Sequence, residues 1–391
     1  MRLRLLVCLL TILLCGSLAC TTRSTTATTT INTVILYLAA QGDSSIQAYS
    51  ATVSSGAIGA SGNPLPTGSM PFAIAITPSL TALFVDNNGS DSVSAYTINP
   101  DGSLTTASGT AKTGSMPTGM AIDPAGKFLF VANQESSNIS VFSINGTALK
   151  EVSGSPFTTI PAGSTVATLP TAVAVSGTGK FLYVTNNFTN TVSAYSIASS
   201  GALTPLGPPP YSVGTAPSGL SLPPSGGFLY VANSGSNNVS AFAICDKVTT
   251  SCASPSSPDG RLTPVAGSPF SAGIGPVAIA VDPGFNFLYV LDKQSSEVSE
   301  YSYAPGSGVL SPLSTPSVST GLTPFSFVIV SGTVGTNVGN TLTNPTDFMY
   351  VANNGSSTVS AFSLTTSSGS LAPLGAATTV AGGNPSAVAA Q

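Results

Sequence analysis

The sequence contains no histidine and no tryptophan among its 391 residues. Charged side chains make up 6% of the chain, whereas a typical soluble domain has about 25%. Without histidine, a zinc site would lack its usual ligands, and the supply of catalytic bases is thin. The formal net charge of −4 argues against binding to nucleic acid or electrostatic attachment to anionic lipid. We therefore predict no nucleic-acid partner.

The N-terminal segment has the features of an export signal. Two arginines precede an apolar run over residues 5–14, which is too short to span a bilayer as a stable helix. The run leads into "SLAC" at residues 17–20, which resembles the bacterial lipoprotein box, where a small residue precedes a cysteine that carries lipid. We predict a signal peptide over residues 1–19 and lipid attachment at Cys20, and ordinary secretion after the same cleavage is the alternative.

The segment that follows is a tether. Residues 21–30 read "TTRSTTATTT", which is polar and carries no hydrophobic periodicity. We expect residues 20–30 to form a lipidated N-terminus and flexible tether. The protein would then be a membrane-anchored lipoprotein of the bacterial cell envelope, periplasmic or on the surface, that contacts the membrane only through its lipid.

Two of the five cysteines lie beyond this region, at Cys245 and Cys252. Six residues separate them in a loop-like stretch, and in an oxidising compartment a local disulfide is the natural pairing. The alternative is a metal pair, which would need ligands that the neighbourhood does not provide. We predict a disulfide, no metal site and no cofactor, with a divalent metal as the weaker alternative.

Aromatic residues recur with a fixed internal spacing. Each of seven "FLY"-like segments ends in an aromatic anchor: Tyr37, Phe84, Phe130, Tyr183, Tyr230, Tyr289 and Tyr350. Twelve residues after each anchor stands a second aromatic, and a short run rich in Asn, Ser, Gly and Asp lies between the two apolar segments. This pattern is typical of strand, tight turn and strand.

Two further strands complete each repeat. A proline that opens a small apolar run lies thirteen residues before most anchors, as in "PFAIAITP" from Pro71, and a weaker strand such as "GALTPLG" follows the second aromatic. In the last repeat Pro324 lies 26 residues before Tyr350, which indicates an insertion of thirteen residues. Four strands per repeat predict an all-β, seven-bladed propeller of four-stranded antiparallel blades. Kelch and WD-type propellers fit less well, because the chain lacks Trp, His and a paired-glycine signature.

The two ends of the chain complement each other. The first repeat lacks a proline-led strand, and the last is followed by "GNPSAVAAQ" without a further anchor. We predict that residues 385–390 add the missing inner strand beside Leu36 and Tyr37, which closes the ring and leaves no exposed edge. The alternative is an open β-solenoid, which would not need complementary ends.

These repeats resemble the YVTN-repeat β-propellers, and in particular the exported bacterial group labelled lactonase-like. Residues 180–186, "KFLYVTN", contain the naming tetrapeptide, and "GSPF" at 154–157 and 267–270 is similar to a motif of the exported members. The resemblance covers residues 31–391 as a single domain. It implies the propeller fold and an enzyme that opens a sugar lactone or interconverts a muconate lactone. No catalytic residue of the family is carried over, and the chain offers few arginines for a phosphorylated substrate.

Charged side chains concentrate in the turns between the second and third strands, which share one face of a propeller. We predict a binding rim there, formed by Asp43, Asp86, Asp91, Glu135, Asp292, Lys293 and Glu297. The alternative is that these side chains cap local backbone groups. The stretch "DNNGSD" at 86–91 also suggests calcium, but it lacks the distal glutamate of an EF-hand.

The sequence is compatible with two functions. The first is a monomeric binding or interaction scaffold for an unknown protein or carbohydrate ligand, with the fifth-repeat cysteine loop and the seventh-repeat insertion as possible recognition elements. The alternative is a lactonase-like hydrolase that opens a sugar lactone with Asp86, Asp292 or Glu297 as base.

Overall fold

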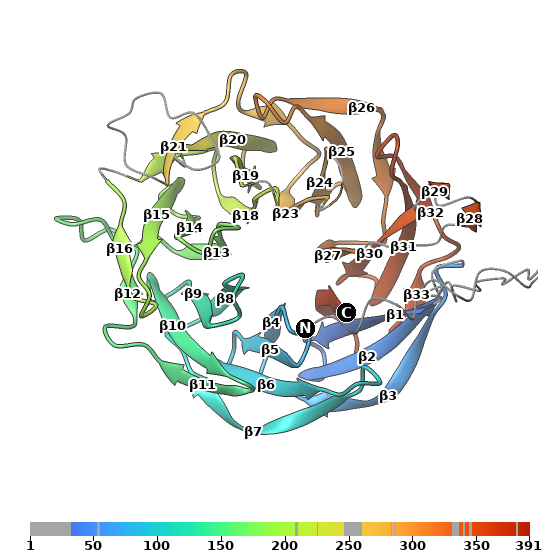
Figure 1. The fold of residues 1–391 in the computed structure, drawn as a ribbon, viewed down its shortest axis with the longest axis horizontal. Coiled ribbons are helices and arrows are strands. Elements are labelled where there is room, and N and C mark those ends of the chain that lie inside the picture. The colour runs from blue at the N-terminus through green and yellow to red at the C-terminus, as the bar shows by residue number, and fades with distance from the viewer. Residues whose placement is uncertain are drawn as a thin grey trace, which may run out of the picture. The chain divides into compact units, whose positions relative to one another are not determined.

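The computed structural model describes residues 33–52, 55–207, 210–224, 226–245, 260–282, 284, 286–330, 336–338, 341–343, 346–380 and 382–391. All regular secondary structure within these ranges is β-strand. The described part of the chain therefore contains no helix that could cross a membrane. Seven antiparallel sheets stand around a central opening (Figure 1). The predicted seven-bladed propeller is confirmed.

The blades are numbered by repeat, and their strands are given from the inner to the outer edge. Blade 1 contains β34 (Pro385–Ala390), β1 (Thr33–Ala40), β2 (Ser45–Thr52) and β3 (Ile58–Pro66). Blade 2 contains β4 (Pro71–Ile76), β5 (Ala82–Asn87), β6 (Ser92–Ile98) and β7 (Leu104–Lys112). Blade 3 contains β8 (Pro117–Ile122), β9 (Phe128–Asn133), β10 (Asn138–Asn145), β11 (Ala148–Glu151) and the short β12 (Phe157–Thr158). Blade 4 contains β13 (Pro170–Val175), β14 (Phe181–Asn186), β15 (Thr191–Ile197), β16 (Leu203–Pro205) and β17 (Tyr211–Ser212).

The remaining blades follow the same order. Blade 5 contains β18 (Pro217–Ser221), β19 (Phe228–Asn233), β20 (Asn238–Cys245), β21 (Arg261–Pro264) and β22 (Phe270–Ser271). Blade 6 contains β23 (Pro276–Val281), β24 (Phe287–Asp292), β25 (Glu297–Tyr303) and β26 (Leu310–Ser319). Blade 7 contains β27 (Pro324–Val330), β30 (Thr346–Asn353), β31 (Thr358–Thr365), β32 (Leu371–Pro373) and β33 (Thr378–Thr379). The insertion lies between β27 and β30, where β28 (Thr336–Val338) and β29 (Thr341–Thr343) pair as a small hairpin.

The C-terminal strand closes the ring as predicted. In the antiparallel pairing of β34 with β1, Leu36 lies opposite Ala390 and Tyr37 opposite Ala389. The Tyr37 hydroxyl donates to Gln391 Oε1 at 2.7 Å, and the Ser386 hydroxyl donates to the Pro71 carbonyl of blade 2 at 2.6 Å. The last residues of the chain therefore join both blade 1 and its neighbour.

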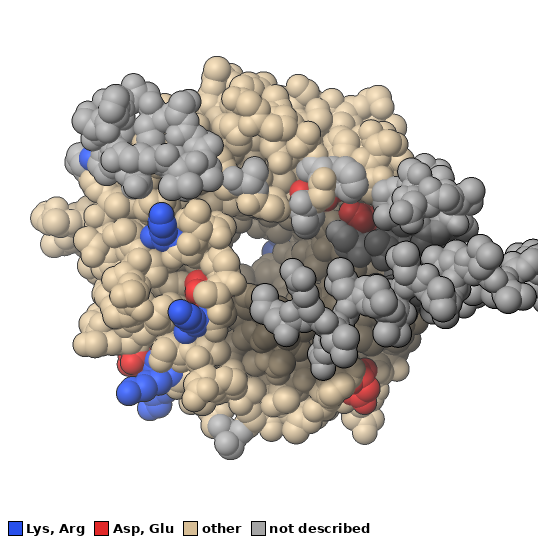
Figure 2. Space-filling view, in the orientation of Figure 1, with Lys and Arg blue, Asp and Glu red and all other residues tan. Residues whose placement is uncertain are grey.

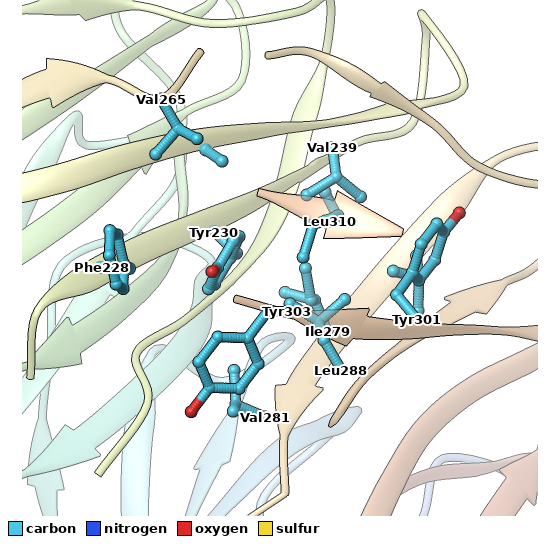
Figure 3. Packing of buried hydrophobic residues seen from close by; sticks show 13 residues of the cluster. Phe228, Tyr230, Val239, Val265, Ile279, Val281, Leu288, Tyr301, Tyr303 and Leu310 are labelled. Carbon is cyan, nitrogen blue, oxygen red and sulfur yellow. The ribbon is translucent and has the colours of Figure 1, made fainter. Parts of the chain in front are cut away.

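Hydrophobic clusters fill the spaces between adjacent blades. Figure 3 shows the cluster between blades 5 and 6, where Tyr230 of β19 packs beside Ile279 of β23 and Tyr303 of β25. The buried anchor hydroxyls also bridge blades: Tyr183 donates to the Gly260 carbonyl and Tyr230 to the Gly308 carbonyl, each at 3.0 Å. Because both sides of a blade face a neighbour, the "FLY" strands are apolar at consecutive positions.

The antiparallel order gives the propeller two unlike faces. We call the face that bears the second-to-third-strand turns and the links between blades the mouth face, and the opposite one the rear face. The predicted signal peptide, Cys20 and tether lie outside the described residues, as does Cys252. The disulfide between Cys245 and Cys252 therefore stays a prediction.

Candidate functional site

A cavity of about 520 Å³ lies at the centre of the ring, and all seven inner strands contribute to its wall. The opening is visible in the space-filling view of Figure 2. Its described lining is made of apolar, hydroxyl and amide side chains, without a charged one: Phe72, Ala73, Ile74, Asn88, Met116, Thr118, Gln134, Thr171, Ala172, Ser218, Gly219, Leu220, Val277, Ala278, Ile279, Phe325, Ser326, Ser386, Ala387 and Val388.

Hydroxyl groups near the mouth face connect one inner strand to the next. In four blades the residue after the first proline of the inner strand donates to the corresponding proline carbonyl of the following blade, at 2.6 to 3.2 Å: Thr118, Thr171, Ser218 and Ser386. In the other three blades this position is Phe72, Val277 or Phe325. Four of the seven blades thus place a satisfied hydroxyl at the mouth, and Val277 and two phenyl groups take the remaining positions.

These two phenyl groups form a distinct sector of the cavity. The rings of Phe72 from β4 and Phe325 from β27 meet edge to face, with centroids 5.0 Å apart, above the inner strand of blade 1. The ammonium of Lys293, the residue directly after β24, lies 4.7 Å from the centre of the Phe325 ring. A cation in contact with an aromatic face is stabilised by the ring quadrupole. Lys293 therefore brings a positive charge to the edge of an otherwise uncharged cavity.

The mouth-face hairpins repeat one arrangement of polar side chains. In five blades an asparagine ends the second strand, and its Nδ2 donates to the side-chain oxygens of the residues five and seven positions later, at 2.7 to 3.1 Å: Asn87, Asn133, Asn186, Asn233 and Asn353. These side chains are almost completely enclosed. The asparagines therefore have a structural role, because each one ties the two strands of its hairpin together.

Blade 6 departs from this arrangement because it has Asp292 at the asparagine position. The side chain is 0% exposed, and its Oδ2 accepts a hydrogen bond of 2.6 Å from the Ser299 hydroxyl. Its cross-strand partner is Glu297, which is half-buried. Burial, together with the nearby charge of Glu297, raises the pKa of Asp292 to about 7. Asp292, Lys293 and Glu297 therefore lie on one hairpin, beside the aromatic sector.

Asp86 lies in a different environment, one position earlier in its repeat. Its Oδ1 accepts a 2.5 Å hydrogen bond from the Ala73 amide on the adjacent inner strand, while its Oδ2 is buried without a hydrogen-bond partner. Burial raises the pKa of this carboxyl to about 7. Asp86 is separated from Asp292 by the intervening blades and does not line the cavity. Of the three proposed bases, Asp292 and Glu297 thus share one hairpin, and Asp86 lies apart from them.

Three other members of the predicted rim are placed in turns. Asp91 accepts a 2.9 Å hydrogen bond from the Met116 amide, and Asp43 accepts one of 2.6 Å from the Ser45 hydroxyl. Glu135 is exposed in the hairpin of blade 3. The turn-capping alternative therefore describes Asp91 and Asp43 better than a binding role does.

Glu300 is a buried carboxyl that sequence reasoning missed. It is 1% exposed in β25, accepts a 3.2 Å hydrogen bond from the Leu371 amide through Oε2, and has its pKa raised by burial to about 7. Most other repeats have alanine at this position, so an alignment of the repeats against one another would have revealed it. Within the described ranges no three acidic or cysteine side chains are grouped so that they could hold a metal.

The sequence matches the family described as "Lactonase, 7-bladed beta-propeller" over residues 31–154 and 149–251. No curated protein sequence matches the chain. Among solved structures, a periplasmic gluconolactonase from Pseudomonas aeruginosa is similar with a TM-score of 0.72 and 20% identity, over 92% of this chain and 99% of that one.

Two further structures have the same fold. A Bacteroides fragilis protein assigned provisionally as a 6-phosphogluconolactonase has a TM-score of 0.73 and 18% identity, over 92% of this chain and 98% of that one. A Lactobacillus plantarum protein also has a TM-score of 0.73, with 17% identity over 92% and 99% of the two chains. At these identities the similarity shows a shared fold.

Proposed function

Because the chain belongs to the family of seven-bladed β-propeller lactonases, we propose that it binds an uncharged sugar lactone at the mouth of the central cavity and hydrolyses its ester bond. The observation that carries the proposal is the position of Lys293. It is a charged side chain in contact with the cavity wall, through the Phe325 ring at 4.7 Å. Family membership favours this hydrolase over the scaffold that the sequence first suggested.

The cavity wall suits a polyhydroxylated ring. The faces of Phe72 and Phe325 offer a surface for the C–H groups of a sugar ring, and the amides of Asn88 and Gln134 line the same cavity with both donors and acceptors. Lys293 would lie beside the lactone carbonyl, where its ammonium stabilises the negative charge that develops on the carbonyl oxygen.

The proton acceptor that we propose is Glu297. Asp292 is enclosed, whereas Glu297 on the same hairpin is half-buried and reachable by water. Glu297 would take a proton from water as the oxygen of that water attacks the carbonyl carbon. Collapse of the tetrahedral intermediate breaks the bond between the acyl carbon and the ring oxygen, and Glu297 returns the proton to that oxygen. The product is the open hydroxy acid.

The lack of charge on the described lining favours a neutral substrate over a phosphorylated one. A phosphate group is usually held by arginine or by several amide donors. Arg261 lies in the outer strand β21, away from the inner strands that line the cavity. A substrate without a phosphate therefore fits this chain better than the one that the Bacteroides fragilis protein's description names.

We also propose that the protein acts outside the cytoplasm. The predicted signal peptide and the predicted lipid at Cys20 support export, and a structurally similar protein is described as periplasmic. The mature protein would then meet its substrate in the cell envelope.

A second candidate function is the binding of another protein on the mouth face. Several large apolar side chains are exposed in its links and hairpins: Met70, Met116, Val166, Phe188, Ile274 and Leu322. Exposed apolar groups are typical of interaction surfaces. If protein binding is the function, replacing Lys293 should not change the rate of lactone hydrolysis.

Replacement of Lys293 tests the hydrolase directly. We expect K293M to lower the rate of hydrolysis of a neutral aldonolactone by about 10²-fold, the typical effect of removing one oxyanion-stabilising group. The matched control is K180M, because Lys180 is exposed on the rear face. Equal rates in the wild-type protein and both variants would refute the assigned site.

Replacement of the proposed base is an independent test. We expect E297Q to reduce hydrolysis by about 10²-fold or more, the usual contribution of general base catalysis. E135Q changes an exposed glutamate in the equivalent hairpin of blade 3 and should have no effect. Loss of activity in both variants would point to a general change in surface charge, and the base would have to be sought elsewhere.

A further inference from the structure

The hairpin of blade 6 contains two carboxyl groups where five of the other hairpins contain an amide and its acceptor. In blade 3 the Nδ2 of Asn133 donates to the Oδ1 of Asn138 at 2.7 Å, and in blade 5 the Nδ2 of Asn233 donates to the Oδ1 of Asn238 at 2.8 Å. The corresponding residues of blade 6 are Asp292 and Glu297, which are also cross-strand partners.

The link that leads into each of these blades contains a glycine that lies against the hairpin side chains. The surroundings of this glycine can be compared between blades 3 and 6. A Cβ at Gly114 would lie 2.8 Å from Asn138 Oδ1 and 2.9 Å from Asn133 Nδ2. A Cβ at Gly273, the matching glycine of blade 6, would lie 2.7 Å from both Asp292 Oδ2 and Glu297 Oε1. Asp292 Oδ2 and Glu297 Oε1 therefore lie against Gly273 as Asn133 Nδ2 and Asn138 Oδ1 lie against Gly114, and Asp292 Oδ2 contacts Ser299 as Asn133 Nδ2 contacts Ser140.

Two ionised carboxylates cannot share this geometry without a donor between them. Neither oxygen has a proton when both groups are charged, and the pair would lose the hydrogen bond that the other hairpins have. A single added proton restores that hydrogen bond. The group that is better solvated should carry the charge, and Asp292 is 0% exposed whereas Glu297 is half-buried.

We propose that Asp292 and Glu297 share one proton, that Asp292 carries it, and that the protonated Asp292 positions the ionised Glu297 as the asparagines position their partners. This inference deepens the proposed function, because Glu297 is the base assigned there. Asp292 is a positioning residue and does not itself contact substrate. In the working state its carboxylic acid donates to Glu297, and the carboxylate of Glu297 remains free to accept a proton from water.

The groups around the pair come from β25, the preceding link, β26 and Lys293. On β25, Glu297 and Tyr301 are the titratable groups that interact with Asp292. The link over residues 272–275 carries no titratable side chain, and Ser319 of β26 lies opposite Glu297. Lys293 directs its ammonium toward the Phe325 ring. The raised pKa of Asp292, about 7, agrees with a proton held at neutral pH.

The first test measures stability, so it does not depend on any substrate. Loss of the shared proton above about pH 7 should lower the melting temperature of the full-length wild-type protein. We expect D292N, which restores the repeated asparagine, to reduce the fall in melting temperature between pH 6 and pH 8 by about 2 °C or more. D43N, an exposed aspartate of the equivalent hairpin in blade 1, should match the wild type. An identical fall in D292N and wild type would overturn the proposal.

The second test measures the shape of the pH–rate profile with a neutral aldonolactone, each curve scaled to its own maximum. The wild-type rate should fall about tenfold per pH unit above the apparent pKa of the pair, because ionised Asp292 no longer positions Glu297. In D292N this alkaline fall should disappear, whereas a merely structural role would leave the shape unchanged. If no lactone is hydrolysed by any form while the stability test succeeds, the proposed function fails and the shared proton stands.

Discussion

Deletion of residues 384–391 is expected to abolish the single cooperative thermal transition of the propeller. The deletion removes β34, which supplies the inner strand of blade 1 and part of the cavity wall. It also removes Ala387 and Val388 from the clusters that join blade 1 to blades 2 and 7. A ring that is opened at one blade exposes strand edges and two hydrophobic interfaces at once.

The matched control is deletion of Gln391 alone. This shorter deletion removes two hydrogen bonds, from the Tyr37 hydroxyl to Gln391 Oε1 and from the Gln391 amide to the Ile35 carbonyl, but leaves β34 in place. We expect it to lower the melting temperature by a few degrees at most, because each of these hydrogen bonds contributes about 1 kcal/mol. Calorimetry of the three forms makes the comparison, and an unchanged sharp transition after the longer deletion would contradict the closure of the ring.

The folded protein is expected to lose stability as the pH rises from about 4 to 8, the opposite of the trend that salt-bridged carboxylates produce. Three buried carboxyls have a pKa raised to about 7 by desolvation: Asp86, Asp292 and Glu300. The folded state therefore retains protons that the unfolded chain releases near pH 4. The stabilisation is complete below the ordinary pKa of these groups and is lost as the pH rises through about 7.

Amide substitutions identify the groups responsible. D86N and E300Q remove a buried ionisable group while keeping the carbonyl oxygen that accepts from the Ala73 or Leu371 amide. We expect chemical denaturation at pH 5 and pH 8 to give a smaller difference in unfolding free energy for each variant than for the wild type. D91N, at an exposed turn, is the control. A wild-type protein that is more stable at pH 8 than at pH 5 would show that these carboxyls are ionised in the native state.

The fold could be predicted from the sequence because each repeat uses the same residues for the same physical purpose. The anchor aromatics fill the spaces between blades, and all seven inner strands begin at a proline. Pro385 marks one more inner strand near the C-terminus in the same way. The closing strand could therefore be predicted from the sequence before its pairing with β1 was seen. Repetition converts weak local signals into a strong global one.

The site was harder to predict, because it depends on side-chain direction. Asp86 and Asp292 occupy adjacent positions of the repeat, so they point to opposite sides of their strands and enter different environments. The contact of Lys293 with Phe325 joins two blades, and no spacing within one repeat reveals it. Phe72 and Phe325 could have been noticed in the sequence. They stand at the position after the inner-strand proline, which is Thr or Ser in four of the repeats.

A crystal structure with an aldonate that carries no phosphate, the product of lactone opening, tests the central claim most directly. We predict that the aldonate lies against Phe72 and Phe325, with a carboxylate oxygen within hydrogen-bonding distance of Lys293 Nζ. A second cavity of about 480 Å³, between blades 3 and 4 and bordered by Tyr195 and Tyr211, is the main competing place for a ligand. An aldonate bound there or on the rear face, with the central cavity empty, would contradict the account.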